Sequence, residues 1–301
     1  MIRRRGIRIL SISVAALALV LAFKPERETD PLAHLKQDTE CGGVGLPCKI
    51  ADREYNVLIP KGTGPFPAVV FFHGSGGSGS QVIQNLNLVR PMLERGYAVI
   101  APTALEIQYR NGPGTGWVWD TQRNERDDFG FVADMLGDAL NRFSIEPTRI
   151  VTAGHSRGGS FSWYLACADV DDRLQAFAPI GGTLLREQPG ACGSSPLDFD
   201  MFYSHGYSDT VIPFQGIGSW LGGSGYMGAI EIAIRFAHEA GCQADELIAA
   251  EGYDKRIMSD CPSGLSLSVI GYQGGHGIPV GWSNLMLDWF EEVTGSNPSS
   301  S

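Results

Sequence analysis

Short segments that are apolar at almost every position recur along the chain. They span residues 55–59, 68–72, 98–101, 150–153, 176–180, 201–204 and 266–270. Strands with apolar side chains on both sides are typical of a parallel sheet that is covered on both faces. The pattern therefore predicts seven strands in a mostly parallel sheet.

Stretches with helical periodicity separate these segments. One predicted helix has apolar residues at i, i+3, i+4 and i+7, namely Phe129, Val132, Met135, Leu136, Ala139, Leu140 and Phe143. Further helices are expected over 227–240 and 284–292, and after the strand at 150–153. Alternation of strands and helices predicts a doubly wound α/β fold with helices flanking the sheet. We expect a single domain over residues 41–293, a polar N-terminal tail over 24–40 and a flexible C-terminal tail over 294–301.

The first residues have the pattern of a targeting signal. Arg3, Arg4, Arg5 and Arg8 precede an uncharged, mostly apolar run over 9–23. This run is shorter than the roughly 20 residues that a membrane-spanning helix needs. Residues 1–23 are therefore predicted to be a signal peptide, with an uncleaved membrane anchor as the alternative. In both cases we expect the folded body outside the cytoplasm, either secreted or periplasmic.

Composition and charge narrow the classes of partner. A hydrophobic content of 43% and a charged content of 19% are typical of a soluble globular protein. The formal net charge is −10, and no basic stripe offsets it, which makes nucleic acid an unsuitable partner. We also expect no membrane contact for the folded body, whereas the oligomeric state stays open.

Six cysteines favour disulfides in an oxidising compartment. No C-x-x-C or Cys/His cluster is present, so we expect no zinc or other metal site. Sequence alone leaves the connectivity open. Two local pairs are attractive: Cys41 with Cys48 around a Gly/Pro turn, and Cys242 with Cys261 around what reads as a polar loop. Cys167 and Cys192 remain.

A candidate nucleophile follows the strand at 150–153. The motif is Gly154-His155-Ser156-Arg157-Gly158, and a helix-compatible stretch comes directly after it. A nucleophile elbow needs a strand, a sharp turn that exposes the serine, and a helix. The flanking glycines permit that turn. Ser156 is therefore the predicted nucleophile, and a glycine-rich turn with a solvent-exposed serine is the alternative.

A catalytic serine needs a base, and the base needs a carboxylate to orient it. In hydrolases with this elbow the order along the chain is serine, acid, base. His276 lies in a glycine-rich loop after the strand at 266–270, whereas His238 lies in a helical pattern. Asp209 follows the strand at 201–204. We predict that His276 is the base and Asp209 the acid.

Ester hydrolysis also needs N–H donors for the developing oxyanion. The predicted donors are the backbone amides of Arg157 and of Ser75, which lies in a glycine-rich loop after the strand at 68–72, with Gly76 as the alternative. Gly76 and His155 are also candidate substrate contacts.

Trp117 and Trp119 lie in another glycine-rich loop. They are candidates for a platform under an aromatic acyl group or a sugar. Packing of a long loop onto the body is the alternative.

Five motifs in order resemble one family. They are H-G-S-G-G-S-G at 73–79, D-D-F-G-F-V at 127–132, G-H-S-R-G-G at 154–159, H-G-Y-S-D-T-V-I-P-F at 205–214 and G-G-H-G-I-P at 274–279. The family is the polyhydroxybutyrate depolymerase and feruloyl esterase group of α/β-hydrolases, and the likeness covers residues 55–290. Ile278 is a departure, because the family commonly has tryptophan there.

The resemblance implies an α/β-hydrolase fold, secretion, and hydrolysis of carboxylic esters through an acyl-enzyme without a metal or organic cofactor. It also implies a bridge between Cys242 and Cys261 near the rim of the active site. The expected function is that of a serine carboxylesterase on feruloyl-, acetyl- or hydroxybutyrate-type esters, whether small, oligosaccharide-linked or in short polyesters. The alternatives are a secreted serine peptidase with the same fold and a catalytically inactive binding relative.

Overall fold

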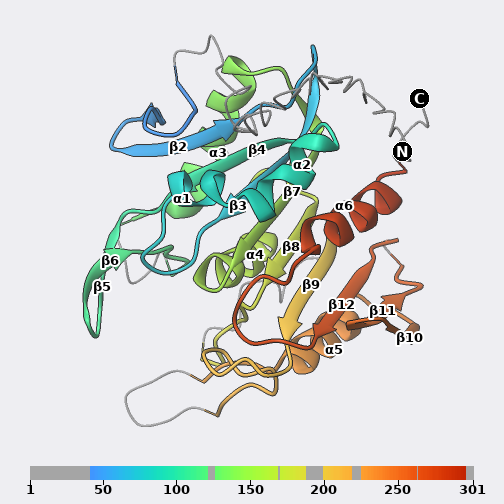
Figure 1. Ribbon diagram of the computed structural model, residues 1–301. Coiled ribbons are helices and arrows are strands. Elements are labelled where there is room, and N and C mark those ends of the chain that lie inside the picture. Colours follow the sequence, from blue (N-terminus) through green and yellow to red (C-terminus); the bar gives the residue numbers. More distant parts are fainter. Residues whose placement is uncertain are drawn as a thin grey trace, which may run out of the picture. The chain divides into compact units, whose positions relative to one another are not determined.

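One large, mostly parallel sheet runs through the computed structural model (Figure 1). Its strand order is β1-β2-β4-β3-β7-β8-β9-β12-β11-β10. The five neighbouring pairs from β4 to β12 are parallel, and the pairs outside them are antiparallel. The strands are β1 (Cys48–Ile50), β2 (Arg53–Leu58), β3 (Phe66–Phe72), β4 (Ala98–Thr103), β7 (Ile145–His155), β8 (Ala176–Ile180), β9 (Asp200–Gly206), β10 (Ala244–Ala250), β11 (Tyr253–Ser259) and β12 (Leu267–Tyr272).

The structure describes residues 41–120, 126–168, 170–187, 199–218, 225–262 and 264–295. All of them belong to the unit Leu35–Ser301. The predicted signal peptide, the predicted N-terminal tail, Cys192 and residues 296–301 of the predicted C-terminal tail lie outside the described residues.

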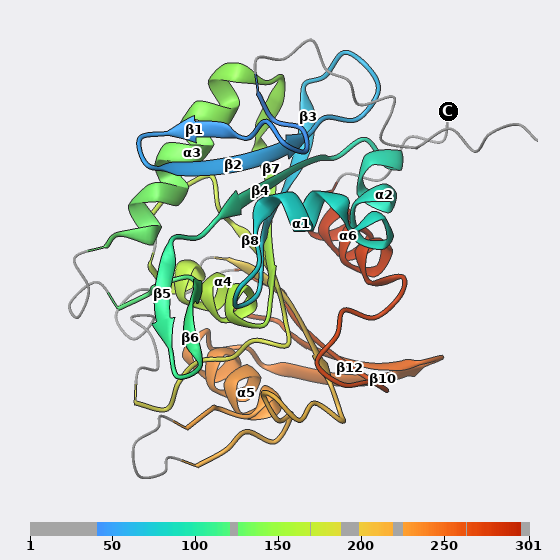
Figure 2. The same ribbon diagram turned by 60° about the vertical axis from the view of Figure 1, so that its left-hand side comes forward.

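Helices cover both faces of the sheet (Figure 2). On one face lie α1 (Gly79–Gln84), α2 (Leu86–Glu94) and α6 (Trp282–Val293), and on the other lie α3 (Asp128–Arg142), α4 (Arg157–Ala168) and α5 (Ala229–Glu239). Side chains of β3 alternate between the two layers. Phe72 meets Phe161 of α4 edge to face, whereas its neighbour Phe71 meets Trp282 of α6. This confirms the predicted doubly wound arrangement.

All seven predicted strands and the helices around 129–143, 227–240 and 284–292 are present. The patterns did not predict β1, α1 and α2, or a small hairpin that follows β4. This hairpin, β5 (Glu106–Tyr109) and β6 (Gly112–Thr115), forms a separate two-stranded sheet. Its strands carry few apolar residues and β6 is half glycine, so hydrophobic alternation is absent there.

The segment between Cys242 and Cys261 was wrongly interpreted as a polar loop. It forms the antiparallel hairpin β10–β11, which extends the sheet beyond β12. Because β10 is the edge strand and its side chains are largely exposed, no buried face imposes an apolar alternation on its sequence.

The disulfide Cys242–Cys261 is present, but its place differs from the one that the resemblance implied. The register pairs Met258 with Leu267, so the bridge lies toward the amino end of β12. The loop carrying His276 leaves the opposite end of this strand. The bridge therefore closes the base of the hairpin, away from the rim of the candidate site.

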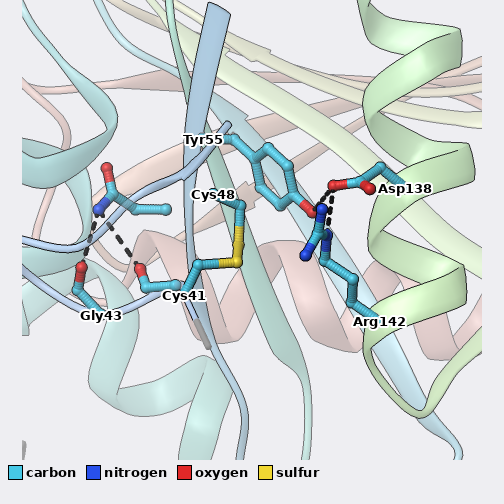
Figure 3. Close-up of a disulfide and its surroundings, with 8 residues drawn as sticks. Cys41, Gly43, Cys48, Tyr55, Asp138 and Arg142 are labelled. Carbon is cyan, nitrogen blue, oxygen red and sulfur yellow. Dashed lines mark hydrogen bonds and ion pairs between the residues drawn. A yellow bond between two sulfur atoms is a disulfide. The ribbon is translucent and has the colours of Figure 1, made fainter. Parts of the chain in front are cut away.

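The other predicted local bridge, Cys41–Cys48, joins the start of the described chain to β1 (Figure 3). Next to it, the Tyr55 hydroxyl on β2 donates a hydrogen bond to Asp138 on α3 at 2.7 Å. Arg142 donates to the same carboxylate oxygen at 2.8 Å. These contacts attach the first strands to α3. Cys167 is also disulfide-bonded.

Among the described helices, none combines the length and the apolar character that a bilayer crossing requires.

Candidate active site

Ser156 occupies a sharp turn between β7 and α4. Its φ of +58° lies in the left-handed region that side chains other than glycine rarely adopt. Tight packing explains the flanking glycines. A Cβ on Gly154 would lie 2.4 Å from the carbonyl oxygen of Gly158, and a Cβ on Gly158 would lie 2.2 Å from the carbonyl oxygen of Phe72. The turn therefore has the geometry expected of a nucleophile elbow.

Ser156, His276 and Asp209 are hydrogen-bonded in series. The Nε2 atom of His276 lies 2.8 Å from Oγ of Ser156, and its Nδ1 atom lies 2.7 Å from Oδ2 of Asp209. An ionised carboxylate only accepts, so Nδ1 carries the hydrogen and Nε2 is free to accept the serine proton. The structure thus brings together the three predicted residues from β7, β9 and β12, with the ring of His276 partly exposed.

The carboxyl group of Asp209 stays ionised although its side chain is fully buried. Burial acts to raise the pKa of Asp209, but hydrogen bonds from His205, His276 and the amides of Ile212 and Val211 outweigh it. The net effect holds this pKa well below its usual range. At neutral pH an ionised carboxylate therefore faces Nδ1 of His276.

Backbone contacts hold the acid and base loops together. The amide of Ser208 donates to the carbonyl of Gly274 at 2.9 Å, and the amide of Tyr207 donates to that of Tyr272 at 3.0 Å. Gly181, with a φ of +55°, lies against the Asp209–His276 hydrogen bond.

His155, a predicted substrate contact, has a structural partner. Its Nε2 donates a hydrogen bond to the carbonyl oxygen of His276, and the two ring centroids lie 5.0 Å apart. Burial lowers the pKa of His155. His155 thus ties the turn at Ser156 to the loop that carries His276.

The loop after β3 approaches Ser156 closely. A Cβ on Gly74 would lie 3.3 Å from Cβ of Ser156. The amide of Gly76 donates to the carbonyl of Thr115 at 2.8 Å, so it is already engaged. The amide of Ser75 has no hydrogen-bond partner among the described residues. Of the two candidates for the second oxyanion donor, Ser75 and Gly76, only Ser75 therefore has an amide available to a ligand.

His73 braces this loop from inside. Its Nε2 accepts a hydrogen bond from the amide of Ala104 at 3.0 Å, and its Nδ1 donates to the carbonyl of Gly74 at 2.6 Å. Burial lowers the pKa of His73 to about 4. A neutral ring with both nitrogens engaged fixes the loop geometry.

Trp117 does not form the predicted platform. Its side chain is fully buried, it stacks on Phe161, and its Nε1 donates to the carbonyl of His73 at 3.0 Å. A buried indole cannot offer a face to substrate, so the packing alternative holds for this residue. Trp119 is only partly buried and stacks on Tyr164 with centroids 4.7 Å apart.

The side chain of Arg157 lies between the two tryptophans and the hairpin β5–β6. Its Nε donates to the carbonyl of Trp117 at 2.8 Å. The guanidinium carbon lies 4.6 Å from the ring centroid of Trp119 and 5.7 Å from that of Tyr109. Burial lowers the pKa of this guanidinium, which still remains charged.

Asp128 anchors the segment 116–119. It is fully buried and accepts hydrogen bonds from the amide of Val118 at 2.7 Å and from Arg126 at 2.5 Å. Arg53 forms an ion pair with its other oxygen at 2.9 Å. In the sequence, Asp128 stands out only as part of a family motif, and nothing local indicates its partners.

Other parts of the site were not found from sequence. His205 lies 3.4 Å from Asp209 and donates to the carbonyl of Ile212, but in the sequence it stands out only as the first residue of a family motif. Tyr109 was missed because its hairpin was missed. Across the described residues, no three His, Cys, Asp or Glu side chains are grouped so as to hold a metal ion.

Comparison with known proteins places this geometry in context. Residues 67–214 match the family described as "alpha/beta hydrolase fold". Feruloyl esterase C of Emericella nidulans is 27% identical over 267 residues, which cover 86% of this chain and 88% of that protein. Feruloyl esterase B of Piromyces equi is 25% identical over 232 residues, which cover 74% of this chain and 42% of that protein.

Among solved structures, the acetyl xylan esterase from Aspergillus awamori is similar with a TM-score of 0.61 at 17% identity. The match covers 79% of this chain and 94% of that one. An S-formylglutathione hydrolase from Agrobacterium tumefaciens has a TM-score of 0.54 at 13% identity and covers 80% of this chain and 89% of its own. At these identities the likeness concerns the fold.

Proposed function

Given that this chain has the α/β-hydrolase fold, we propose that it is a secreted serine carboxylesterase acting on acyl or aryl esters through Ser156, His276 and Asp209. The observation that carries the proposal is the hydrogen-bonded series from Asp209 through His276 to a serine held at a φ of +58°. Relatives named feruloyl esterases, at 24–27% identity, support the reaction class.

In the first half-reaction, Oγ of Ser156 attacks the ester carbonyl carbon while its proton passes to Nε2 of His276. The carbonyl oxygen becomes an oxyanion, and the amides of Ser75 and Arg157 donate hydrogen bonds to it. Each such donor typically contributes about 10²–10³ in turnover. The C–O bond then breaks, and His276 returns the proton to the departing alcohol. An acyl-enzyme on Ser156 remains.

In the second half-reaction, water attacks the acyl-enzyme, and His276 accepts one of its protons. Collapse of the second oxyanion releases the carboxylic acid and restores the Ser156 hydroxyl. The ionised Asp209 stabilises the imidazolium in both halves because its pKa is held low.

Secretion is proposed on two grounds. The first is the arginine-rich, then apolar start of the sequence. The second is the pair of disulfides Cys41–Cys48 and Cys242–Cys261, which persist in oxidising compartments.

A rate panel tests the proposal. The purified mature protein is assayed on methyl ferulate, acetylated xylan, short 3-hydroxybutyrate oligomers and p-nitrophenyl esters of graded length. Labelling by a fluorescent phosphonate, followed by mass spectrometry of the labelled peptide, locates the nucleophile. We expect hydrolysis of at least one ester class and modification of Ser156. Absence of both hydrolysis and labelling would refute the proposal, and a label on another residue would refute the site.

A further inference from the structure

Arg157 carries a positive charge that no described residue neutralises. Apart from the Nε bond to Trp117, its guanidinium forms no hydrogen bond or ion pair within the described part of the chain. Its two terminal nitrogens are not fully buried, so they are accessible to solvent. The side chain next to the candidate nucleophile therefore has donors available for a ligand.

The carboxylate of Asp128 is already engaged by other arginines. It acts to raise the pKa of Arg157 but lies beyond ion-pair distance from it, and its two oxygens bind Arg126 and Arg53. The chain as a whole has a formal net charge of −10. An uncompensated arginine that directly follows Ser156 in the chain is thus a local exception in an acidic protein.

The surrounding side chains hold this guanidinium in place before a ligand binds. Trp119 and Tyr109 lie close to it, as cation–π partners do. A Cβ on Gly116 would lie 2.2 Å from Oη of Tyr109 and 3.1 Å from Nε of Arg157, so only glycine allows this approach. Fixed in this way, a planar guanidinium suits bidentate recognition of a carboxylate.

We propose that the Arg157 side chain binds a carboxylate on the substrate, so that the enzyme selects esters carrying an anionic group on their acyl or alcohol part. This inference rests on the proposed esterase function and names the substrate class of the same site.

Matched substrates isolate the charge. For an anionic alcohol part, the pair is 4-acetoxybenzoate and 4-acetoxybenzamide, which differ only in carboxylate against amide. For an anionic acyl part, it is the p-nitrophenyl monoester of adipic acid and p-nitrophenyl hexanoate. The kcat/KM ratio within each pair is the readout. We expect the anionic member to be favoured in one pair, which also identifies the part of the ester that Arg157 binds.

Variants assign the preference to the guanidinium. In Arg157→Met the ratio in the favoured pair should fall by roughly 10- to 100-fold, the usual effect of losing a charged hydrogen bond. The ratio for Arg157→Lys should lie between those of the wild type and Arg157→Met, because the charge remains but the planar donors are lost. The matched control is Arg110→Met, at the exposed turn of the hairpin β5–β6, which removes one positive charge and should leave the ratio unchanged.

A measurement on the wild type alone does not depend on how well the variants fold. The non-hydrolysable acid 4-acetamidobenzoate and its neutral amide are compared as competitive inhibitors of p-nitrophenyl acetate hydrolysis, and the analogous acyl-side pair is adipamate and hexanamide. We expect at least one of the two acids to have a lower inhibition constant than its neutral counterpart.

The inference fails if neutral esters are hydrolysed but both ratios are the same in Arg157→Met as in the wild type, or if neither acid inhibits better than its amide. If no ester is hydrolysed at all, the proposed function fails instead.

Discussion

Two regions on either side of Ser156 are built in different ways. The nucleophile side comprises the turn at 154–158 and the loops that carry Asp209 and His276. Backbone hydrogen bonds and glycine contacts with almost no spare space hold it together. The arginine side comprises the hairpin β5–β6, residues 116–119 and the side chain of Arg157. Side-chain contacts hold it, namely the buried Asp128 network and the aromatic neighbours of Arg157.

This difference suggests that one region carries out the reaction and the other selects the substrate. A region fixed by backbone contacts changes little when surface side chains change, so it suits chemistry common to all substrates. A region fixed by side chains can be altered one residue at a time without moving the nucleophile. We therefore expect changes on the nucleophile side to abolish turnover of every ester, and changes on the arginine side to alter stability or preference.

The largest effect is expected for Ser156→Ala. Loss of the nucleophile should reduce kcat for p-nitrophenyl acetate by about 10⁶-fold, as in other triads. The matched control is Ser162→Ala on α4, the helix that follows Ser156. The buried Ser162 hydroxyl has no partner among the described residues, so its removal should leave kcat unchanged. Retention of activity in Ser156→Ala would assign the chemistry to another residue.

A smaller loss is expected for Asp209→Asn. The amide can donate toward Nδ1 of His276, which favours the wrong tautomer of the base, so kcat should fall by about 10⁴-fold. Kinetics on the same ester measure it, with circular dichroism to show that the variant is folded. A fall of less than tenfold in a folded variant would exclude Asp209 as the orienting acid.

On the arginine side, Asp128→Asn should act mainly on stability. It leaves Arg53 buried without its ionic partner, and breaking a buried pair in this way costs about 3–5 kcal/mol in the free energy of unfolding. Denaturant titration measures the change. Asp127→Asn is the control, because Asp127 caps α3 through the amide of Gly130 and asparagine caps equally well. Equal stability of the two variants would contradict the anchoring role.

His73 lies between the two sides, and its effect depends on pH. Its pKa in the fold is about 4, against an ordinary value of 6.5. Between these values the unfolded chain binds a proton that the folded chain does not. Acidification from pH 6.5 to 4 should therefore remove about 3 kcal/mol of stability through this residue. The gap in unfolding free energy between the wild type and His73→Gln should narrow over that range, as measured by denaturant titrations at each pH. A constant gap would show that the ring titrates normally.

The predictable parts of this protein are those with strong local signals. The strands at 68–72 and 176–180 are apolar throughout, and the strand at 150–153 is apolar except for Thr152, because both faces of the sheet are covered; this coverage is visible as a sequence pattern. The turn at Ser156 was predictable because G-x-S-x-G directly after an apolar strand is a local sequence signal, although the contact that requires Gly158 comes from Phe72 on the neighbouring strand β3. The hairpin β10–β11 was missed for the converse reason, since an exposed edge strand needs no apolar pattern.

Sequence patterns alone were enough to predict the doubly wound fold, the glycine-flanked Ser156, and Asp209 and His276 as its candidate partners. The burial of Trp117, the hydrogen bond of the Gly76 amide, and the position of Arg157 near two aromatic rings without an acidic partner among the described residues are visible only in the folded structure. The reason is the separation along the chain of the residues that make each kind of contact. Strand patterns and tight turns arise from neighbours in sequence, whereas burial and charge compensation depend on side chains that the fold brings together from distant segments.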